Sequence, residues 1–380
     1  MTDLAARRAG SLGLAQKVLR LNWALILLII AIAGTGFLML YSVAGGSLTP
    51  WALNQAVRFA AFFAMALTMS YIPVARYKDL AFPAYGAVLV LLFAVEAIGR
   101  MGGGAQRWLN LGFITLQPSE LMKPVLIVAL ARFYELLPLA EMRRWIAIWP
   151  ALFLIMVPVA LIVVQPDLGT AVTVLAGGLV MMFLAGLPLR YFFGGAALLA
   201  AAIPLAYNFI LHDYQRRRVA IFLNPEADPL GAGYHLSQSK IAIGSGGIFG
   251  KGFLKGTQSN LDYLPEGHTD FVFASMAEEW GLMGGIALIF AFALLLRWGM
   301  RVALRARDRF SRLAAAGLTV TIFLYFAVNL LMVMGLAPVV GIPLPLVSYG
   351  GSAMLTIMLC IGVLMAIHRD NEADARRRRW

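Results

Sequence analysis

The chain has 380 residues, of which 61% are hydrophobic and 13% are charged, and its mean hydropathy is +0.80. A soluble globular domain carries about 25% charged residues, so this composition excludes an ordinary soluble fold and indicates a polytopic membrane protein. The single cysteine, Cys360, excludes a disulfide framework and a cysteine-based zinc site within the chain.

Apolar runs near the roughly 20 residues that cross a bilayer predict an all-α polytopic membrane fold of about ten transmembrane helices. We expect these spans to begin near residues 23, 51, 79, 116, 145, 168, 190, 271, 312 and 344. The first run is too long for the core of a signal peptide, so we interpret it as a span. The predicted parts are a cytoplasmic N-terminal segment (1–22), a transmembrane domain (23–368) and a basic cytoplasmic tail (369–380).

Basic residues are concentrated in the connecting segments on one side of the predicted membrane, and this distribution predicts the orientation of the chain. Arginine and lysine gather in residues 7–20, 76–78, 132–144, 297–312 and 369–379, whereas the opposite short loops hold only Arg100 and Arg107. The positive-inside rule then places both termini in the cytoplasm. The net charge of +12 therefore reflects topology and contact with anionic lipids, and we expect no nucleic-acid partner.

One connection is long: residues 212–270 form a large extracytoplasmic loop between the seventh and eighth helices. Residues 234–243 mix apolar and polar side chains in a pattern that predicts a helix lying at the membrane interface. The stretch GSGGIFGKG resembles a phosphate-binding loop, but Gly252 stands where that motif needs Ser or Thr. We interpret it as a flexible glycine-rich hinge.

Unusual polar and Gly/Pro-rich segments gather on the predicted outer side. They are GGGAQRWLNLG (102–112), QPSELMK (117–123), QPDLGT (165–170), HTDF (268–271) and PLPLVSYGGS (343–352). Irregular backbone at membrane depth is tolerated only where protein or water satisfies its polar groups. The sequence therefore predicts a polar cavity that opens outward.

The acidic residues of these segments each have two interpretations. Asp270 opens the eighth span, where the helix dipole favours an ionised carboxylate that can hold a cation, accept a proton or simply cap the helix. Asp167 is either a cap for the sixth span or a functional ligand. Glu120 and Lys123 share a helix face at i and i+3, so they form a structural ion pair or take part in chemistry.

The basic and aromatic residues nearby suggest the kind of substrate. By default Trp108 belongs to the aromatic belt and Arg107 contacts lipid headgroups. An acid, a buried lysine and arginines facing outside also suit a substrate with a hydroxyl to deprotonate and an anionic group to bind. Outside the cytoplasm such a donor must arrive activated within the membrane, as a lipid-linked diphosphate sugar does. A transporter would instead place charges near the midplane, often with internal symmetry.

The segments GAQRWLNLGFITLQPSELMKP, QPDLGT, GTQSNLDYLPEGHTDFVFASMAEEWGLMGG and PLPLVSYGGS resemble the SEDS family (shape, elongation, division and sporulation) over essentially all spans. The long outer loop resembles the corresponding loop of the elongation branch more than that of the division branch. The resemblance implies a peptidoglycan glycosyltransferase that polymerises lipid II on the outer face of the cytoplasmic membrane during elongation and rod-shape maintenance. It also implies a class B penicillin-binding protein and other elongation-complex proteins as partners.

The resemblance further implies roles for particular residues. Asp270 matches the essential loop acid, Asp167 a second carboxylate, Glu120 with Lys123 the paired charges, and Trp108 a tryptophan near the cavity. It implies a divalent cation, Mg²⁺ or Mn²⁺, for which we name Asp270 and Asp167 as ligands. The remaining supporting or substrate-binding candidates are Arg107, Glu266, His268, Lys240 and Ser348.

On this hypothesis Asp270, alone or through a bound cation, deprotonates the GlcNAc 4-hydroxyl of an incoming lipid II. The oxygen then attacks the anomeric carbon of the lipid-linked strand with inversion, and undecaprenyl diphosphate leaves. Lys123, Arg107, residues 216–218 or the metal would stabilise the charge on the leaving diphosphate. Two alternatives remain: a flippase for lipid II and a scaffold of the wall-synthesis complex without chemistry. A flippase needs polar residues on both sides of the midplane, and the cytoplasmic half of this sequence looks bare.

Overall fold

The computed structural model describes residues 22–102, 105–110, 115–142, 144–209, 216, 232–261, 263–264 and 266–377. The predicted N-terminal segment, apart from Asn22, lies outside these residues. So do most of the first half of the long loop, including residues 217 and 218, and the last residues of the basic tail.

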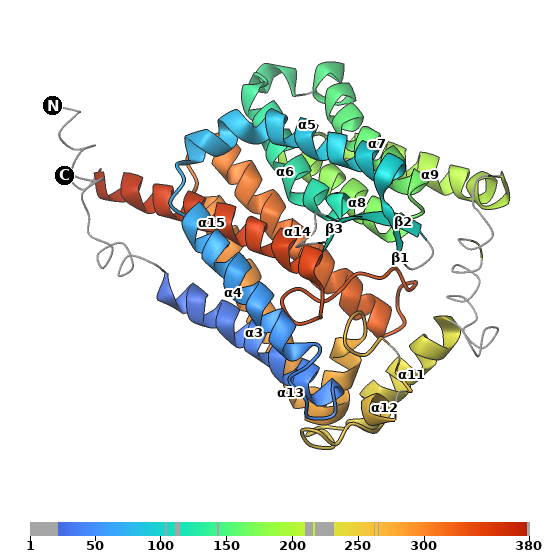
Figure 1. The fold of residues 1–380 in the computed structure, drawn as a ribbon. Helices are drawn as coiled ribbons and strands as arrows, with labels where there is room; N and C mark the ends of the chain where they lie inside the picture. Colours follow the sequence, from blue (N-terminus) through green and yellow to red (C-terminus); the bar gives the residue numbers. More distant parts are fainter. Residues whose placement is uncertain are drawn as a thin grey trace.

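A helix lies at each of the predicted spans (Figure 1). These helices are α3 (Trp23–Val43), α4 (Ala52–Met69), α5 (Val74–Ile98), α6 (Pro118–Leu136), α7 (Trp149–Val164), α8 (Leu168–Leu184), α9 (Leu189–Phe209), α13 (Val272–Arg305), α14 (Arg309–Val333) and α15 (Gly351–Arg377). Short 3-10 turns, η1 (Leu139–Glu141) and η2 (Trp145–Ala147), join α6 to α7. The fold class is therefore the helical membrane protein that the sequence predicts.

The helices differ in how well they suit a membrane. Among the described residues, seven are long and apolar enough to cross one, and α8, with 17 residues, is a shorter apolar helix. α6 is less apolar because it carries Glu120, Lys123, Arg132 and Glu135. α15 starts after the predicted residue 344 because PLPLVSYG, with two prolines, does not form a helix. The ten-span topology stays a prediction.

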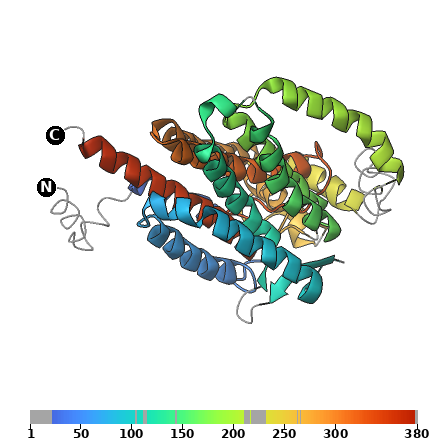
Figure 2. The ribbon, with the colours of Figure 1, turned by 90° about the horizontal axis from the view of Figure 1, so that it is seen from above.

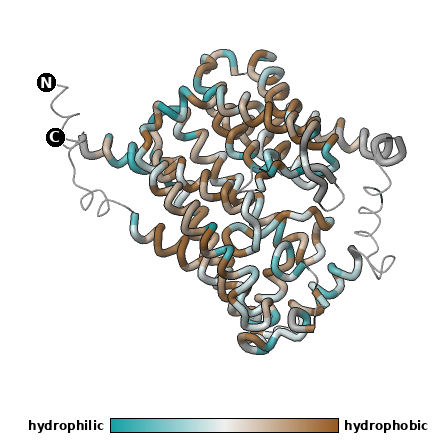
Figure 3. The backbone as a smooth tube through the Cα atoms, viewed as in Figure 1, coloured by the Kyte–Doolittle hydropathy of each residue, from teal (hydrophilic) through white to brown (hydrophobic). Residues whose placement is uncertain are grey.

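α14 and α15 form the centre of the bundle. In their apolar windows 67% and 78% of the residues are buried, against 22% in α4. α6 and α8 pack against α14, and α4 packs against α15. α9 lies at the edge of the bundle in both ribbon views (Figures 1 and 2). Hydrophobic residues follow the helices, and hydrophilic residues concentrate toward the helix ends (Figure 3).

A small antiparallel sheet lies where the sequence predicted only an outer loop. It consists of β1 (Arg100–Gly102), β2 (Ala105–Asn110) and β3 (Thr115–Leu116) in the order β1-β2-β3. Trp108 of β2 pairs with Arg100, and Leu109 pairs with Leu116. The sheet leads directly into α6 and so fixes where α6 begins.

The second half of the long loop packs against α13. Residues 234–243 form a helix as predicted, within α11 (Ala232–Ser245), and α11 contacts α13 and α14; the short α12 (Thr257–Asn260) follows. The backbone of α13 is broken at Gly281, whose φ and ψ are 65° and −163°. Loop and helix exchange backbone hydrogen bonds there: Lys251 and Gly252 donate to the carbonyls of Glu278 and Glu279, and Leu282 and Met283 donate to Gly247 and Ile248.

This pairing corrects the prediction of a flexible hinge at GSGGIFGKG. Broken helical hydrogen bonds at the buried Gly281 would leave backbone N–H and C=O groups without partners, and the loop supplies those partners. A Cβ at Gly250 would lie 2.1 Å from the Glu279 carbonyl oxygen, so a glycine is needed for this close approach. The glycines thus serve packing against α13.

Candidate functional site

The segment joining α14 to α15, residues 334–350, is the centre of the site, and we call it the α14–α15 loop. It contains PLPLVSYG (343–350) of the last polar motif. Leu346 in this loop is buried and has a φ of 64°. Such backbone strain in a bulky residue persists only where the surroundings hold it, and it is common at functional sites.

Asp270 lies in the turn just before α13, next to this loop. The half-buried Asp270 has its Oδ2 3.5 Å from the position that a Cβ of Gly341 would take. The side-chain amide of Asn329, on α14, donates to the Asp270 carbonyl at 2.9 Å and to the Ile342 carbonyl at 2.7 Å. One buried amide therefore fixes both the turn that carries Asp270 and the loop beside it.

Asp167 is the N-cap of α8, as one of its two interpretations predicted. Its Oδ1 accepts a hydrogen bond from the Thr170 backbone N–H at 3.2 Å, and its Oδ2 accepts one from Gln117 Nε2 at 2.9 Å. The residue is only 6% exposed. Arg107 of β2 donates to the carbonyls of Gln165 and Pro166 in the same turn, rather than reaching out to headgroups.

The structure brings Asp270 and the first turn of α8, which Asp167 caps, to the same stretch of the α14–α15 loop. Gly169, in the first turn of α8, lies against Val340, and a Cβ there would be 2.5 Å from the Val340 carbonyl oxygen. Asp270 lies against the next residue, Gly341. The turn that carries Asp270 and the helix capped by Asp167 thus contact neighbouring backbone positions.

Glu120 and Lys123 form a buried ion pair, as one of their two interpretations predicted, with a third member from α14. Lys123 Nζ lies 2.5 Å from Glu120 Oε1 and donates to the Tyr325 hydroxyl at 2.9 Å, and Tyr325 in turn donates to Glu120 Oε2. Tyr325 and Asn329 are i and i+4 on α14, so they share a face and the ion pair lies one turn below Asn329. A small cavity borders this cluster, lined by Lys123, Ile127, Thr173, Val174, Gly177, Thr321, Leu324 and Tyr325.

His268 and Glu266 lie in the turn that carries Asp270. Glu266 is exposed and accepts a hydrogen bond from the Thr269 hydroxyl. Burial lowers the pKa of His268 below its usual value, and the nearby Glu266 carboxylate opposes this effect only in part. His268 is therefore neutral at pH 7 and provides no fixed positive charge for a diphosphate.

The remaining candidates take structural positions around the α14–α15 loop. The buried Ser348 Oγ accepts from the Leu344 backbone N–H at 2.8 Å, so Ser348 shapes the loop itself. Lys240 of α11 lies against Gly335 at the start of the loop. Trp108 is half-buried in β2, opposite Arg100.

Three side chains of the site were missed in the sequence: Gln117, Tyr325 and Asn329. Each is a polar group beside or within an apolar run, where an unpaired amide or hydroxyl is costly. Gln117 stands in the QPSELMK motif, and Asn329 interrupts TIFLYFAVNLLMV. The isolation of these polar residues in apolar sequence indicated that each needs a partner. Their partners lie on other elements, so the spacing of residues along the chain could not identify them.

The described residues contain no group of three or more His, Cys, Asp or Glu side chains that could hold a metal ion. Mg²⁺, however, usually keeps several waters and is bound by one or two carboxylates together with substrate phosphates. Asp270, with no more than one further carboxylate, fits that kind of site. A protein cage of several acids does not fit the described residues.

Comparison with known proteins agrees with this arrangement. The FtsW, RodA and SpoVE family, described as cell cycle protein, matches residues 21–373. Peptidoglycan glycosyltransferase MrdB of Escherichia coli K12 is 48% identical over 304 residues, which cover 80% of this chain and 81% of MrdB. A chain from a peptidoglycan synthase complex, solved to describe how polymerization and crosslinking are coordinated, matches with a TM-score of 0.81 at 36% identity, covering 93% of this chain and 99% of that one.

RodA of Thermus thermophilus, a rod shape determining protein, has the same fold. Its crystal structure matches with a TM-score of 0.70 at 32% identity, covering 93% of this chain and 98% of RodA. The family match spans nearly all of the described helices, and the motifs that suggested the SEDS resemblance lie within it. The chain belongs to the family of FtsW, RodA and SpoVE.

Proposed function

We propose that this chain is a peptidoglycan glycosyltransferase that polymerises lipid II at the outer face of the cytoplasmic membrane during cell elongation. The observation that carries the proposal is that Asp270 and the first turn of α8, which Asp167 caps, lie against the neighbouring residues Gly341 and Val340 of the α14–α15 loop. It occurs in a chain that is 48% identical to the peptidoglycan glycosyltransferase MrdB over most of both lengths.

Asp270 is the general base of the proposed reaction. Its carboxylate takes the proton from the GlcNAc 4-hydroxyl of an incoming lipid II, and that oxygen forms the new bond to the anomeric carbon of the lipid-linked strand. The bond from that carbon to the diphosphate breaks, configuration inverts, and undecaprenyl diphosphate leaves with the electron pair. Asn329 holds the Asp270 backbone, so the base is positioned before substrate binds.

Asp167 and Arg107 shape the opposite side of the proposed site. The two oxygens of Asp167 accept hydrogen bonds from Thr170 and Gln117, so the main role of Asp167 is to order the turn before α8. A divalent cation held by Asp270 would neutralise the leaving diphosphate. Lys123 is already paired with Glu120 and Tyr325, which makes it a supporting charge and not a free phosphate ligand.

The proposed partners and cellular location are supported by the comparisons and by the distribution of basic residues. We propose that a class B penicillin-binding protein supplies crosslinking, since a similar chain occurs in a peptidoglycan synthase complex. Membrane lipids and elongation-complex proteins are further partners. The basic segments of the sequence favour cytoplasmic termini and an extracytoplasmic site in the inner membrane.

Purified protein with lipid II, assayed for glycan chains with moenomycin present to silence contaminating polymerases, tests the function. Asp270→Ala and Asp270→Asn should reduce polymerisation by about 10³-fold or more, since general-base catalysis contributes 10²–10⁴-fold. Asp374→Asn, at an exposed acid near the far end of α15, is the matched control and should polymerise normally. Glycan synthesis by Asp270→Ala at the wild-type rate would reject the assignment.

A further inference from the structure

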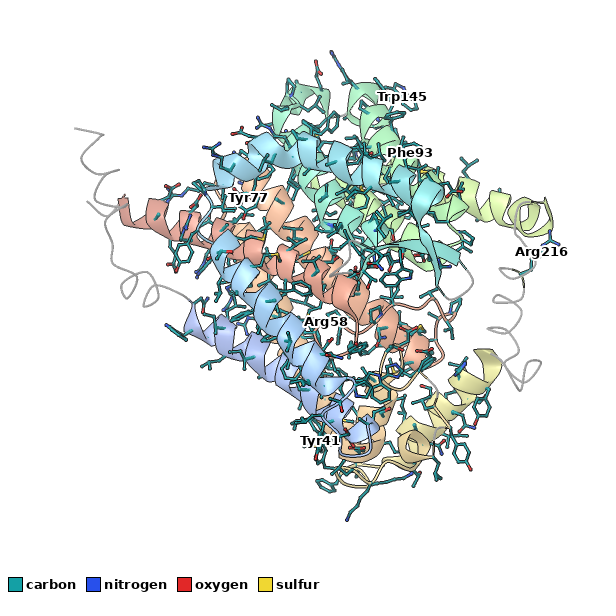
Figure 4. All side chains as sticks on the ribbon, viewed as in Figure 1. Tyr41, Arg58, Tyr77, Phe93, Trp145 and Arg216 are labelled. Atoms are coloured by element: carbon teal, nitrogen blue, oxygen red, sulfur yellow. The ribbon has the colours of Figure 1, made fainter. Side chains whose placement is uncertain are left out.

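One face of α4 meets both motif segments of the proposed site. Trp51, Gln55 and Arg58 follow one another at i, i+4 and i+7, so they share a face. Trp51 is the N-cap residue of α4, and Arg58, marked in Figure 4, lies further along the same helix. This face is polar and aromatic although α4 is otherwise an apolar helix on the outside of the bundle.

The contacts of this face are specific. The Trp51 indole stacks on the His268 imidazole with ring centroids 4.3 Å apart and an angle of 14° between the planes. Gln55 Nε2 donates to the Ser348 carbonyl at 2.6 Å, and the Arg58 guanidinium lies 4.8 Å from the centre of the Tyr349 ring. α4 therefore contacts the Asp270 turn and the α14–α15 loop at once.

The turn and the loop are also joined to each other at this point. The Tyr349 backbone N–H donates to the His268 carbonyl at 2.9 Å, and the two rings lie 6.3 Å apart. His268 is two residues before Asp270 in the same short turn. Whatever holds the His268 ring therefore also limits where the Asp270 carboxylate can lie.

We propose that Trp51 is a positioning residue of the glycosyl transfer site: by stacking on His268 it holds the turn that presents Asp270 beside the α14–α15 loop. The proposal rests on the proposed function. Nothing in the reaction itself requires Trp51 to touch substrate. Its contribution comes through His268, because small displacements of a catalytic group cost large factors in rate.

Two other roles of a tryptophan at a helix end fit these contacts less well. An interfacial anchor would direct its ring toward headgroups, whereas the half-buried Trp51 ring stacks on His268. A stacking surface for a sugar would need a free ring face turned to the substrate. The face of Trp51 that points toward the Asp270 turn is covered by His268.

Replacement of Trp51 in the full-length protein with its partner tests the proposal, with polymerisation of lipid II as the readout. Trp51→Ala and Trp51→Leu should lower kcat by about 10- to 100-fold, while KM for lipid II stays within about twofold. Trp51→Phe should retain activity within about threefold, because a phenyl ring still stacks on imidazole. Trp145→Ala, which removes an exposed indole elsewhere, is the matched control.

A double-mutant cycle shows whether Trp51 acts through His268. The double variant, Trp51→Ala with His268→Ala, should be as active as the less active of the two single variants, because each substitution removes the same stacking interaction. The proposal would be overturned if the fold-losses in activity of the two single variants multiply in the double variant. A raised KM with unchanged kcat, or wild-type activity of Trp51→Leu, would also overturn it. Thermal unfolding checks that the Leu and Phe variants fold alike. An inactive wild-type protein would instead refute the proposed function.

Discussion

At the scale of single residues, the ion pair between Glu120 and Lys123 has almost no access to water. The side chains are 8% and 3% exposed. Removing one buried charge leaves the other without compensation and costs about 3–5 kcal/mol. Lys123→Met should therefore lower the melting temperature of the purified protein sharply, and adding Glu120→Gln should recover most of the loss. Equal melting temperatures of the single and double variants would show that the two charges do not depend on each other.

The sequence predicted those residues whose partners lie close along the chain. The pairing of Glu120 with Lys123 follows from a spacing of three, and the capping by Asp167 follows from its place before an apolar run. Tyr325, Gln117 and Asn329 were missed because their partners lie on other helices or turns. Only the packing of α6, α8 and α14 brings these groups together.

At the scale of elements, the break in α13 depends on Gly281. Its φ of 65° disfavours any side chain, and a Cβ there would lie 2.3 Å from the Gly250 backbone nitrogen. Gly281→Ala should destabilise the protein by at least about 1–3 kcal/mol from backbone strain alone. Gly285→Ala, one turn further, meets only ordinary contacts with Phe273 and should be neutral by comparison. Differential scanning fluorimetry in detergent measures both.

Hydropathy was sufficient to place the helices but not their irregularities. Apolar runs of span length predicted where each long helix lies, because desolvation of the backbone leaves few alternatives in a membrane. The break at Gly281 and the small sheet before α6 were not predicted. Both depend on backbone pairing with another segment, and glycine in WGLMGG has no pattern that distinguishes a break from a helix interior.

At the scale of the whole molecule, the orientation of the chain can be tested with cysteine labels. Cys360 is fully buried, so Cys360→Ser gives a suitable background. In spheroplasts a membrane-impermeant maleimide should label Ser47→Cys, in the exposed turn between α3 and α4. It should label Asp374→Cys only after the membrane is permeabilised. The reverse pattern would place the Asp270 turn on the cytoplasmic side and remove its lipid-linked substrate.

The α14–α15 loop also bears on how such an enzyme could be switched on. This single stretch of chain contacts Gly36 in α3, Gly169 in α8, Lys240 in α11 and the Asp270 turn. These four elements cannot shift independently while the loop stays in place. An activating protein therefore need not approach Asp270 itself, because a displacement of α3, α8 or α11 would reach the Asp270 turn through the loop that they share.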